Sequence, residues 1–421
     1  MSTSSLTAPV PTPAPSPSPL RVRLALLALA LGGFGIGATE FVAMGLLPQI
    51  ARDLLPAAWA ASSDDAIAQS GTMIAAYALG VVVGAPTIAV FAARLPRRRI
   101  LLGLAIAFTV GTAASALAPT FELVVLFRFL AALPHGAYFG IAALVAASLM
   151  GPGKRGQGVA LVLSGLTVAN VVGVPLITFL GQQAGWRVAY LAVAGIFALA
   201  VVAIAVTVPW QPGDPAATAR RELGAFRRPA VWFALLTGSI GFTGFFAVYS
   251  YVAPLTTEVT GLPETWVPFA LVTLGLGMTV GNLAGGWAAD RGVLRALFLC
   301  FGVFAVALLG LALTAQTLVG LFAFLFGVGA AAAALSPAIQ TRLMDVAGDS
   351  QTLAAAVNHS ALNIGNALGA ALGGAVIAAG WGYVAPTWLG LAMCAPGVLL
   401  ALAGTWVTAS AARRAAGATT A

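Results

Sequence analysis

Twelve apolar segments cover most of this chain, and they narrow the choice of fold more than any other feature. A helix needs about 20 mostly apolar residues to cross the hydrocarbon core of a bilayer. Only 8% of the 421 residues are charged, against roughly 25% in an ordinary soluble domain. The sequence therefore predicts an all-α polytopic membrane protein, with spans near residues 24–48, 67–93, 99–118, 121–149, 157–181, 187–209, 229–253, 264–289, 295–315, 317–342, 351–380 and 384–409.

The longest polar interval between spans divides the chain into two sets of six helices. It contains Pro212, Gly213 and Pro215, followed by basic pairs. Residues 1–20 are rich in proline, serine and threonine and carry no charge, so they cannot bury enough apolar surface to fold. The expected parts are a disordered N-terminal tail (1–20), an N-terminal six-helix half (21–209), a cytoplasmic linker (210–228), a C-terminal six-helix half (229–410) and a cytoplasmic tail (411–421).

The two halves resemble each other. Three residues of the first half recur 196 positions later, and the pairs are Ser164 and Ser360, Asn170 and Asn366, and Gly173 and Gly369. Several matches at nearly one offset indicate duplicated, pseudo-symmetric six-helix halves. This architecture is typical of transporters that rock about a central site.

Positive charge is distributed unevenly between the two sides of the predicted spans. With a cytoplasmic N-terminus, 17 of the 20 Lys and Arg residues fall on the cytoplasmic side; Arg52 and Arg187 fall outside, and Arg128 lies within a span. Basic residues concentrate on the cytoplasmic side of membrane proteins. We therefore expect a multi-pass protein of the bacterial inner membrane with both termini in the cytoplasm. The net charge of +8 then reflects membrane anchoring, and no nucleic-acid partner is expected.

The residue types needed for metal or hydrolytic chemistry are scarce. Cys300 and Cys394 each lie inside an apolar run, so a CxxC site is excluded. His135 and His359 are far apart in the sequence, and a metal centre would need carboxylates that the spans mostly lack. Gly-x-Ser-x-Gly, HExxH and Gly-Lys-Ser/Thr sequences are absent. We expect a non-enzyme with no metal and no cofactor, and with the proton as its coupling ion.

Glu40 is the only carboxylate deep inside a predicted span, where a charge costs at least about 2–3 kcal/mol. It is the first candidate for taking a proton from one side and releasing it to the other. The alternative is that Glu40 pairs with an arginine to hold two helices together. Arg128 is the only basic residue deep inside a span, and both residues lie roughly 10–12 Å from the same face at 1.5 Å per residue. Equal depth allows a direct or cavity-mediated pairing.

Other polar residues inside spans are also candidates. His135 follows Arg128 by seven residues, so both should project from one helix face about 10 Å apart; His135 either relays protons or packs as a neutral side chain. His359, Asn363 and Asn366 form a polar stripe that must face a cavity or bond a neighbouring helix. From the repeat alone, we hypothesise that the amides of Asn170 and Asn366 lie near each other.

Aromatic, thioether and amide side chains are candidates for an amphipathic substrate pocket, with ordinary core packing as the alternative for each. The candidate substrate-binding residues are Phe41, Met44, Tyr77, Tyr138, Asn170, Tyr249, His359, Asn363 and Asn366. Glycines spaced by four, such as Gly277, Gly281 and Gly285, predict close helix packing. Gly173 and Pro175 predict a bend in the fifth span.

Several short stretches carry a family likeness. They are Thr39-Glu40-Phe41, Leu46-Leu47-Pro48, Tyr77-Ala78-Leu79-Gly80, Gly84-Ala85-Pro86, Arg94-Leu95-Pro96-Arg97-Arg98-Arg99, Pro134-His135-Gly136-Ala137-Tyr138-Phe139-Gly140 and Ala169-Asn170-Val171-Val172-Gly173-Val174-Pro175. Together they resemble the major facilitator superfamily over essentially the whole chain, in particular the arabinose-efflux-permease-like branch of its drug:proton antiporter group. The resemblance implies the major facilitator fold, with twelve helices in two halves.

The resemblance also implies roles for individual residues. The loop after the second span is similar to the family's cytoplasmic gating motif, but Ala93 stands where an aspartate is usual. The expected gate residues are Arg94, Arg97, Arg98, Gly286, Asp290 and Arg291. Because only the second-half copy keeps its aspartate, ion pairing at the gate is expected to depend on Asp290. Arg128 matches an arginine that the family associates with proton transfer, so Glu40, Arg128 and His135 are the candidate proton-coupling residues.

The expected function is a proton-coupled antiporter that exports a small organic solute, either amphipathic and drug-like or sugar-like. The alternative is a proton-coupled or facilitated importer of a sugar or metabolite, and the direction of coupling separates the two. A membrane-embedded hydrolase is not favoured, because the sequence lacks the motifs of that class. A helical receptor or scaffold is not favoured either, because neither function requires a buried carboxylate such as Glu40 to bind and release protons. The expected partners are the substrate, the proton and membrane lipid, and the chain is expected to be a monomer.

Overall fold

The computed structural model describes residues 18–92, 95–151, 154–213, 227–347 and 351–419. Within these residues all regular structure is helical, and 12 helices are long and apolar enough to cross a membrane. The predicted all-α polytopic fold is therefore confirmed. The elements of the first half are α1 (Pro19–Leu54), α2 (Pro56–Ala61), α3 (Ser63–Ser70), α4 (Thr72–Ala92), α5 (Arg97–Leu117), α6 (Phe121–Ala132), α7 (His135–Met150), α8 (Arg155–Val168), the π-helix η1 (Ala169–Gly173), α9 (Val174–Ala184) and α10 (Trp186–Thr207).

The second half repeats this plan with fewer interruptions. Its elements are α12 (Pro229–Ser250), α13 (Val252–Pro254), the π-helix η3 (Leu255–Val259), the 3₁₀-helix η4 (Glu264–Trp266), α14 (Val267–Arg291), α15 (Val293–Thr314), α16 (Leu318–Ala347), α17 (Gln351–Val376), the π-helix η5 (Ile377–Trp381) and α18 (Ala385–Thr419).

Two terminal helices are longer than their apolar segments. α1 begins at Pro19 and continues through Pro48 to Leu54, so Pro48 does not end the first span as expected. α18 continues to Thr419 through most of the expected tail at 411–421. Of the expected N-terminal tail, residues 1–17 lie outside the described part of the chain.

The fourth span, expected to be continuous over 121–149, consists of two helices. α6 ends at Ala132 and α7 starts at His135, with Leu133 and Pro134 between them. A proline has no N–H for the helical ladder and its ring clashes with the carbonyl four residues earlier. Leu133 and Pro134 keep right-handed helical dihedral angles, and Arg128 and His135 both approach Tyr77, so the two residues share one face of the span as expected.

The fifth span changes its helix type near the expected bend. The N–H of Val174 donates to the carbonyl of Ala169, five residues earlier, which gives one π-helical turn before α9. Pro175 follows at the start of α9 and cannot donate a backbone hydrogen bond. The helix type thus changes at Gly173, next to Pro175, and the bend expected there stays a prediction.

Close helix packing is repeated in the two halves. A Cβ on Gly80 or Gly84 of α4 would collide with the carbonyls of Phe129 and Leu133. In the second half, a Cβ on Gly277 or Gly281 of α14 would collide with the carbonyls of Phe326 and Ala330. The differences 277 − 80, 281 − 84, 326 − 129 and 330 − 133 are all 197. The same close contact between glycines of one helix and carbonyls of the next therefore occurs at equivalent positions in the two halves.

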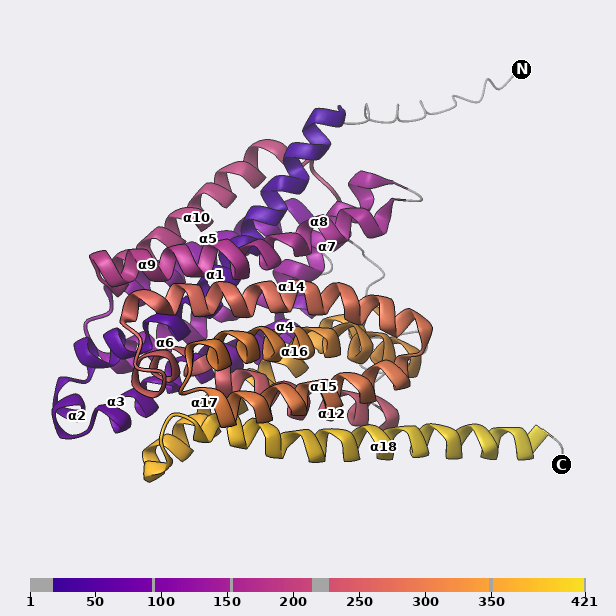
Figure 1. The fold of residues 1–421 in the computed structure, drawn as a ribbon. Helices are drawn as coiled ribbons and strands as arrows, with labels where there is room; N and C mark the ends of the chain where they lie inside the picture. Colours follow the sequence, from indigo (N-terminus) through magenta and orange to yellow (C-terminus); the bar gives the residue numbers. More distant parts are fainter. Residues whose placement is uncertain (1–17, 93–94, 152–153, 214–226, 348–350, 420–421) are drawn as a thin grey trace, which may run out of the picture.

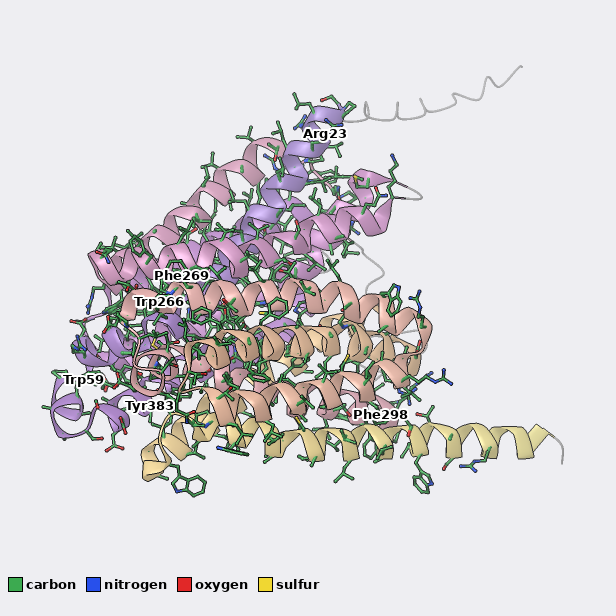
Figure 2. All side chains as sticks on the ribbon, viewed as in Figure 1. Arg23, Trp59, Trp266, Phe269, Phe298 and Tyr383 are labelled. Carbon is green, nitrogen blue, oxygen red and sulfur yellow. The ribbon has the colours of Figure 1, made fainter. Side chains whose placement is uncertain are left out.

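The halves meet along one end and the middle of the bundle. The start of α1 and the end of α18 lie at one end, and α1 and α10 tilt away from α14 and α18 toward it (Figure 1). At the other end Gln49 and Gln182 both donate to Glu264, at 2.8 Å each. Figure 2 shows Trp59, Trp266 and Tyr383 at this second end, far from Arg23. Among the described residues, the hydrogen bonds between the halves lie at this end and at mid-depth.

Candidate functional site

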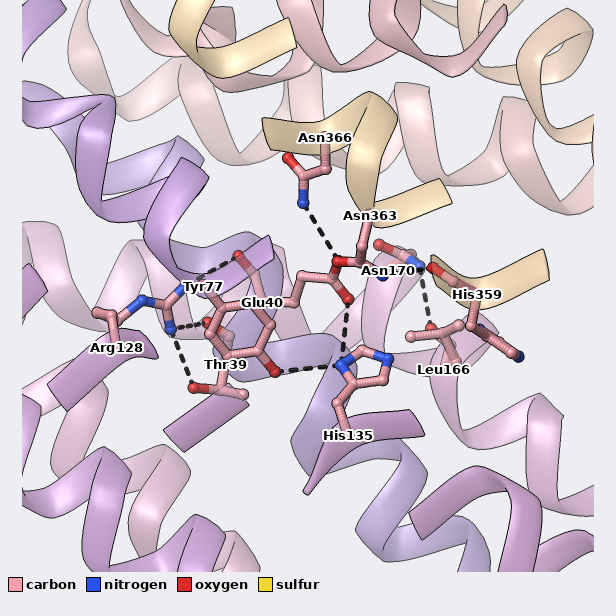
Figure 3. A network of polar contacts seen from close by, with 10 residues as sticks. All are labelled: Thr39, Glu40, Tyr77, Arg128, His135, Leu166, Asn170, His359, Asn363 and Asn366. Atoms are coloured by element: carbon pink, nitrogen blue, oxygen red, sulfur yellow. Dashed lines mark hydrogen bonds and ion pairs between the residues drawn. The ribbon is translucent and has the colours of Figure 1, made fainter. Parts of the chain in front are cut away.

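The carboxylate of Glu40 lies in the middle of the bundle between the two halves. Glu40 is only 5% exposed, because it stands in the middle of the long apolar helix α1. Asn366 of α17 donates its Nδ2 to Oε1 of Glu40 at 3.3 Å. The Nδ1 atom of His135 of α7 lies 4.0 Å from Oε2. Figure 3 shows Asn366 and His135 approaching the carboxylate from opposite sides.

Arg128 lies next to Glu40, but its guanidinium binds the main chain. Nη1 donates to the carbonyl of Thr39 at 2.5 Å and to its hydroxyl at 3.3 Å. Nη2 donates to the carbonyl of Glu40 at 3.5 Å, and the guanidinium carbon lies 4.2 Å from the centre of the Tyr77 ring. The expected proximity of Arg128 and Glu40 is therefore found, whereas a charge pair between their side chains is not. Both terminal nitrogens of the guanidinium are directed to the main chain of α1 instead.

The two histidines lie close together despite their separation in sequence. Their ring centres are 6.4 Å apart, and the ring of His359 stacks on Phe139 at 5.6 Å. The hydroxyl of Tyr77 lies 3.3 Å from Nδ1 of His135. Glu40, Tyr77, His135 and His359 thus form one polar cluster with contributions from four helices. No spacing in the sequence pointed to the histidine pair, because it depends on how α7 and α17 pack.

The polar stripe on α17 serves two different purposes. Asn363 donates to the carbonyl of His359 on its own helix at 3.0 Å, whereas Asn366 reaches Glu40 in the other half. Asn170 donates to the carbonyl of Leu166 at 3.1 Å and accepts from the hydroxyl of Tyr249 in the other half at 3.4 Å. Asn170 and Asn366 do not bond each other; each amide instead makes its own contact with the opposite half, and their hypothesised proximity stays a prediction.

The aromatic candidates divide into a cross-half stack and core residues. The ring of Phe41 on α1 stacks on Tyr249 of α12, with centres 5.2 Å apart and planes 12° apart. Tyr138 donates its hydroxyl to the carbonyl of Leu29 at 3.0 Å, which joins α7 to α1. Met44 is fully buried in the core. The structure therefore places Phe41 and Tyr249 at the centre and uses Met44 and Tyr138 for packing.

The described gate residues bind within their own half. Arg97 approaches Gln211 at 3.5 Å, and Arg98 donates to the carbonyl of Ala205 near the end of α10. Arg291 donates to the carbonyl of Trp287 at 3.0 Å and lies over its ring, while Gly286 has open space beside it. Arg94 and the side chain of Asp290 lie outside the described part of the chain, so the expected ion pairing at the gate stays a prediction.

Sequence reasoning missed the residues that join the halves at the end opposite the termini. Gln49, Gln182 and Glu264 form one contact, and the hydroxyl of Tyr383 donates to Asp64 at 2.7 Å in another. Burial and this hydrogen bond raise the pKa of Tyr383, so its hydroxyl remains a donor at any physiological pH. A cavity of about 180 Å³ lies between the halves here, with Gln49, Arg52, Trp59, Glu258, Glu264 and Tyr383 among its lining residues. Glu122 and Glu264 are exposed at the ends of their spans.

Metal ligands do not gather anywhere in the described residues. No group of three or more His, Cys, Asp or Glu side chains is placed to hold an ion there. Twelve membrane helices in two similar halves, with polar side chains meeting at mid-depth between them, define a secondary transporter.

Comparison with known proteins agrees with this class. The model of the Major Facilitator Superfamily matches residues 29–351 and 267–420, and the chain belongs to this family. It is 40% identical to the inner membrane transport protein YdhP of Escherichia coli over 84% of this chain and 88% of that protein. It is 35% identical to the putative transporter AraJ of Escherichia coli, over 84% and 87%. It is 33% identical to a chloramphenicol resistance protein of Streptomyces lividans, over 87% and 91%. These relatives confirm the resemblance to the arabinose-efflux-permease-like branch.

Proposed function

We propose that this transporter exchanges protons for a small organic solute and exports that solute across the bacterial inner membrane. The observation that carries the proposal is the Glu40 carboxylate, buried between the halves with Asn366 and His135 beside it. Because Arg128 binds the main chain, the carboxylate is free to exchange a proton without breaking an ion pair. One such carboxylate corresponds to one proton in each cycle.

The transport cycle follows if the proton and the solute bind to different conformational states of the transporter. When the outer side opens, Glu40 takes a proton as the solute leaves. The return to the inward-facing state exposes Glu40 to the cytoplasm, where the proton departs and the next solute binds. Such exchange requires only that protonation and solute binding favour different states.

The direction of transport is proposed from the relatives and from the topology. A relative named for chloramphenicol resistance favours export of amphipathic, drug-like compounds, with a sugar-like solute as the second class. The excess of basic residues at the end that holds the termini supports a cytoplasmic location for that end. With this orientation, the end joined through Glu264 faces outward, so the structure is closed on that side.

The test uses purified protein in liposomes with an acidic lumen and a lumenal pH dye. A panel of neutral, cationic and sugar-like compounds is added outside, one at a time. We expect at least one compound to enter while protons leave the lumen, and Glu40→Gln to lose this proton movement. Glu122→Gln is the matched control, because Glu122 is exposed at the start of α6.

Two outcomes would contradict the proposal. If a compound equilibrates across the wild-type membrane without moving protons, the transporter is not proton-coupled. If protons and compound always move in the same direction, the protein is a symporter, and the importer of a sugar or metabolite becomes the better description.

A further inference from the structure

The amide of Asn366 differs from the other two amides near the centre. Asn170 and Asn363 each donate to a carbonyl four residues earlier on their own helix. Asn366 donates instead to the Glu40 carboxylate, which belongs to the other half. Among these three amides, only that of Asn366 donates to a carboxylate.

The oxygen atoms of Asn363 and Asn366 are buried and have no hydrogen-bond partner. In each residue the Nδ2 atom is fixed on an acceptor, so the oxygen must point away from that acceptor. The two residues are 4% and 0% exposed, and they lie three positions apart on α17, where side chains are neighbours. A buried acceptor without a donor is unfavourable. These two oxygens are therefore suited to receive hydroxyl or N–H groups of a bound molecule.

We propose that Asn366 couples proton binding to solute binding by turning its amide over. With Glu40 ionised, Nδ2 donates to the carboxylate and Oδ1 is available, beside Oδ1 of Asn363, for a hydroxyl or N–H donor of the solute. With Glu40 protonated, the carboxyl O–H needs an acceptor, so Oδ1 turns toward Glu40 and Nδ2 turns toward the solute. The solute then meets a donor where it had met an acceptor, and it binds more weakly.

The turn requires little rearrangement. The terminal torsion of an asparagine is broad and roughly two-fold, and its oxygen and NH₂ group have nearly the same shape. The proton comes from water and forms the O–H bond of the Glu40 carboxyl, and no other covalent bond of the protein changes. Linkage then requires that a bound solute disfavours protonation of Glu40 by the same factor by which protonation disfavours the solute. This inference rests on the proposed proton exchange and assigns its solute to compounds with hydroxyl or N–H donors.

Other groups around Glu40 do not replace Asn366 in this role. Arg128 of α6 binds the carbonyls of α1, and His135 of α7 stays 4.0 Å from the carboxylate. Tyr77 of α4 and Tyr249 of α12 interact with Glu40 electrostatically, and their hydroxyls are directed to His135 and Asn170. Asn366 is the described side chain that donates a hydrogen bond to this carboxylate.

Infrared difference spectroscopy tests the turn without a solute. The wild-type protein, labelled with ¹³C at its asparagine side-chain carbonyls, is placed in lipid vesicles and moved from pH 9 to pH 5. We expect a new carboxylic-acid band, lost in Glu40→Gln, and a simultaneous downward shift of one labelled amide band. The conservative variant Asn366→Gln keeps an amide but removes the label, so the shifting band should disappear. In Asn170→Gln the shift should remain.

The possible results separate the inference from the proposed function. An acid band without any shift of a labelled amide band means that Glu40 takes a proton while Asn366 stays fixed, which overturns the inference alone. A shift that persists in Asn366→Gln also overturns it. If no acid band disappears in Glu40→Gln, Glu40 is not the proton site, and both the inference and the proposed function are wrong.

Discussion

Arg128 and Glu40 are neighbours in the middle of the bundle, yet the guanidinium donates to the main-chain carbonyls of Thr39 and Glu40 and not to the carboxylate. Arg128 is 1% exposed, and the rings of Tyr77 and Tyr190 lie over its guanidinium. The arginine therefore holds α6 against α1 and leaves the carboxylate to Asn366 and His135.

Replacing Arg128 by lysine should lower stability more than it alters proton binding. A lysine has no planar fork to reach both carbonyls and stack on Tyr77, and hydrogen bonds to charged groups contribute about 1.5–3 kcal/mol. We expect a lower melting temperature in detergent for Arg128→Lys, with the Glu40 acid band retained. An unchanged melting temperature together with loss of the acid band would show that Arg128 acts on the carboxylate itself.

A side chain on Gly281 should prevent the second half from packing. Its Cβ would enter the space of the Ala330 carbonyl on α16, and backbone atoms cannot move aside cheaply. We expect Gly281→Leu to leave little folded protein in the membrane, measured by monodisperse yield after extraction. Gly103→Leu is the control, since Gly103 is exposed with nothing within 4 Å of its added Cβ. Equal yields would contradict the close approach of α14 and α16.

Loss of the Glu264 side chain should favour opening at the end opposite the termini. Glu264→Ala removes the bond from Gln49, and a net hydrogen bond contributes about 0.5–1.5 kcal/mol, which corresponds to a population change of roughly 2- to 12-fold. Distances between spin labels on either side of this end should lengthen. The control is Asp65→Asn, because Asp65 is exposed and lies beside the bonded Asp64. A distance distribution like that of the wild type would contradict the role of Glu264.

His135→Gln should distinguish proton relay from packing. Because Nδ1 of His135 faces Glu40 and Tyr77 while its ring neighbours His359, we expect a relay in which loss of the imidazole slows proton movement about 100-fold. Compound binding should remain within about threefold of the wild type. Stopped-flow recording of the lumenal pH in liposomes measures the rate. Wild-type proton rates in His135→Gln would leave His135 as a packing residue.

The sequence was sufficient for the architecture because hydropathy and the repeat depend on local composition. Twelve spans, two similar halves and the buried position of Glu40 were all predictable in this way. The hydrogen-bond partner of the Glu40 carboxylate was not predictable. Arg128 and Glu40 lie at equal depth in the membrane, but depth does not determine which atoms of the two helices face each other. His135 and His359, and likewise Gln49 and Glu264, meet only through the packing of helices distant in the sequence. The interruption of the fourth span at Pro134 does not follow from hydropathy, because the apolar run continues through it.

The hydrogen bonds that hold the two halves together at the Glu264 end set the free energy needed to open that end. This closure consists of hydrogen bonds to the exposed Glu264 and the half-buried Asp64, and three such bonds contribute about 2–4 kcal/mol in total. One elementary charge that crosses a potential of 100 mV releases about 2.3 kcal/mol. At a membrane potential of ordinary size, the inward movement of a single proton is thus comparable to the free energy that holds this end shut.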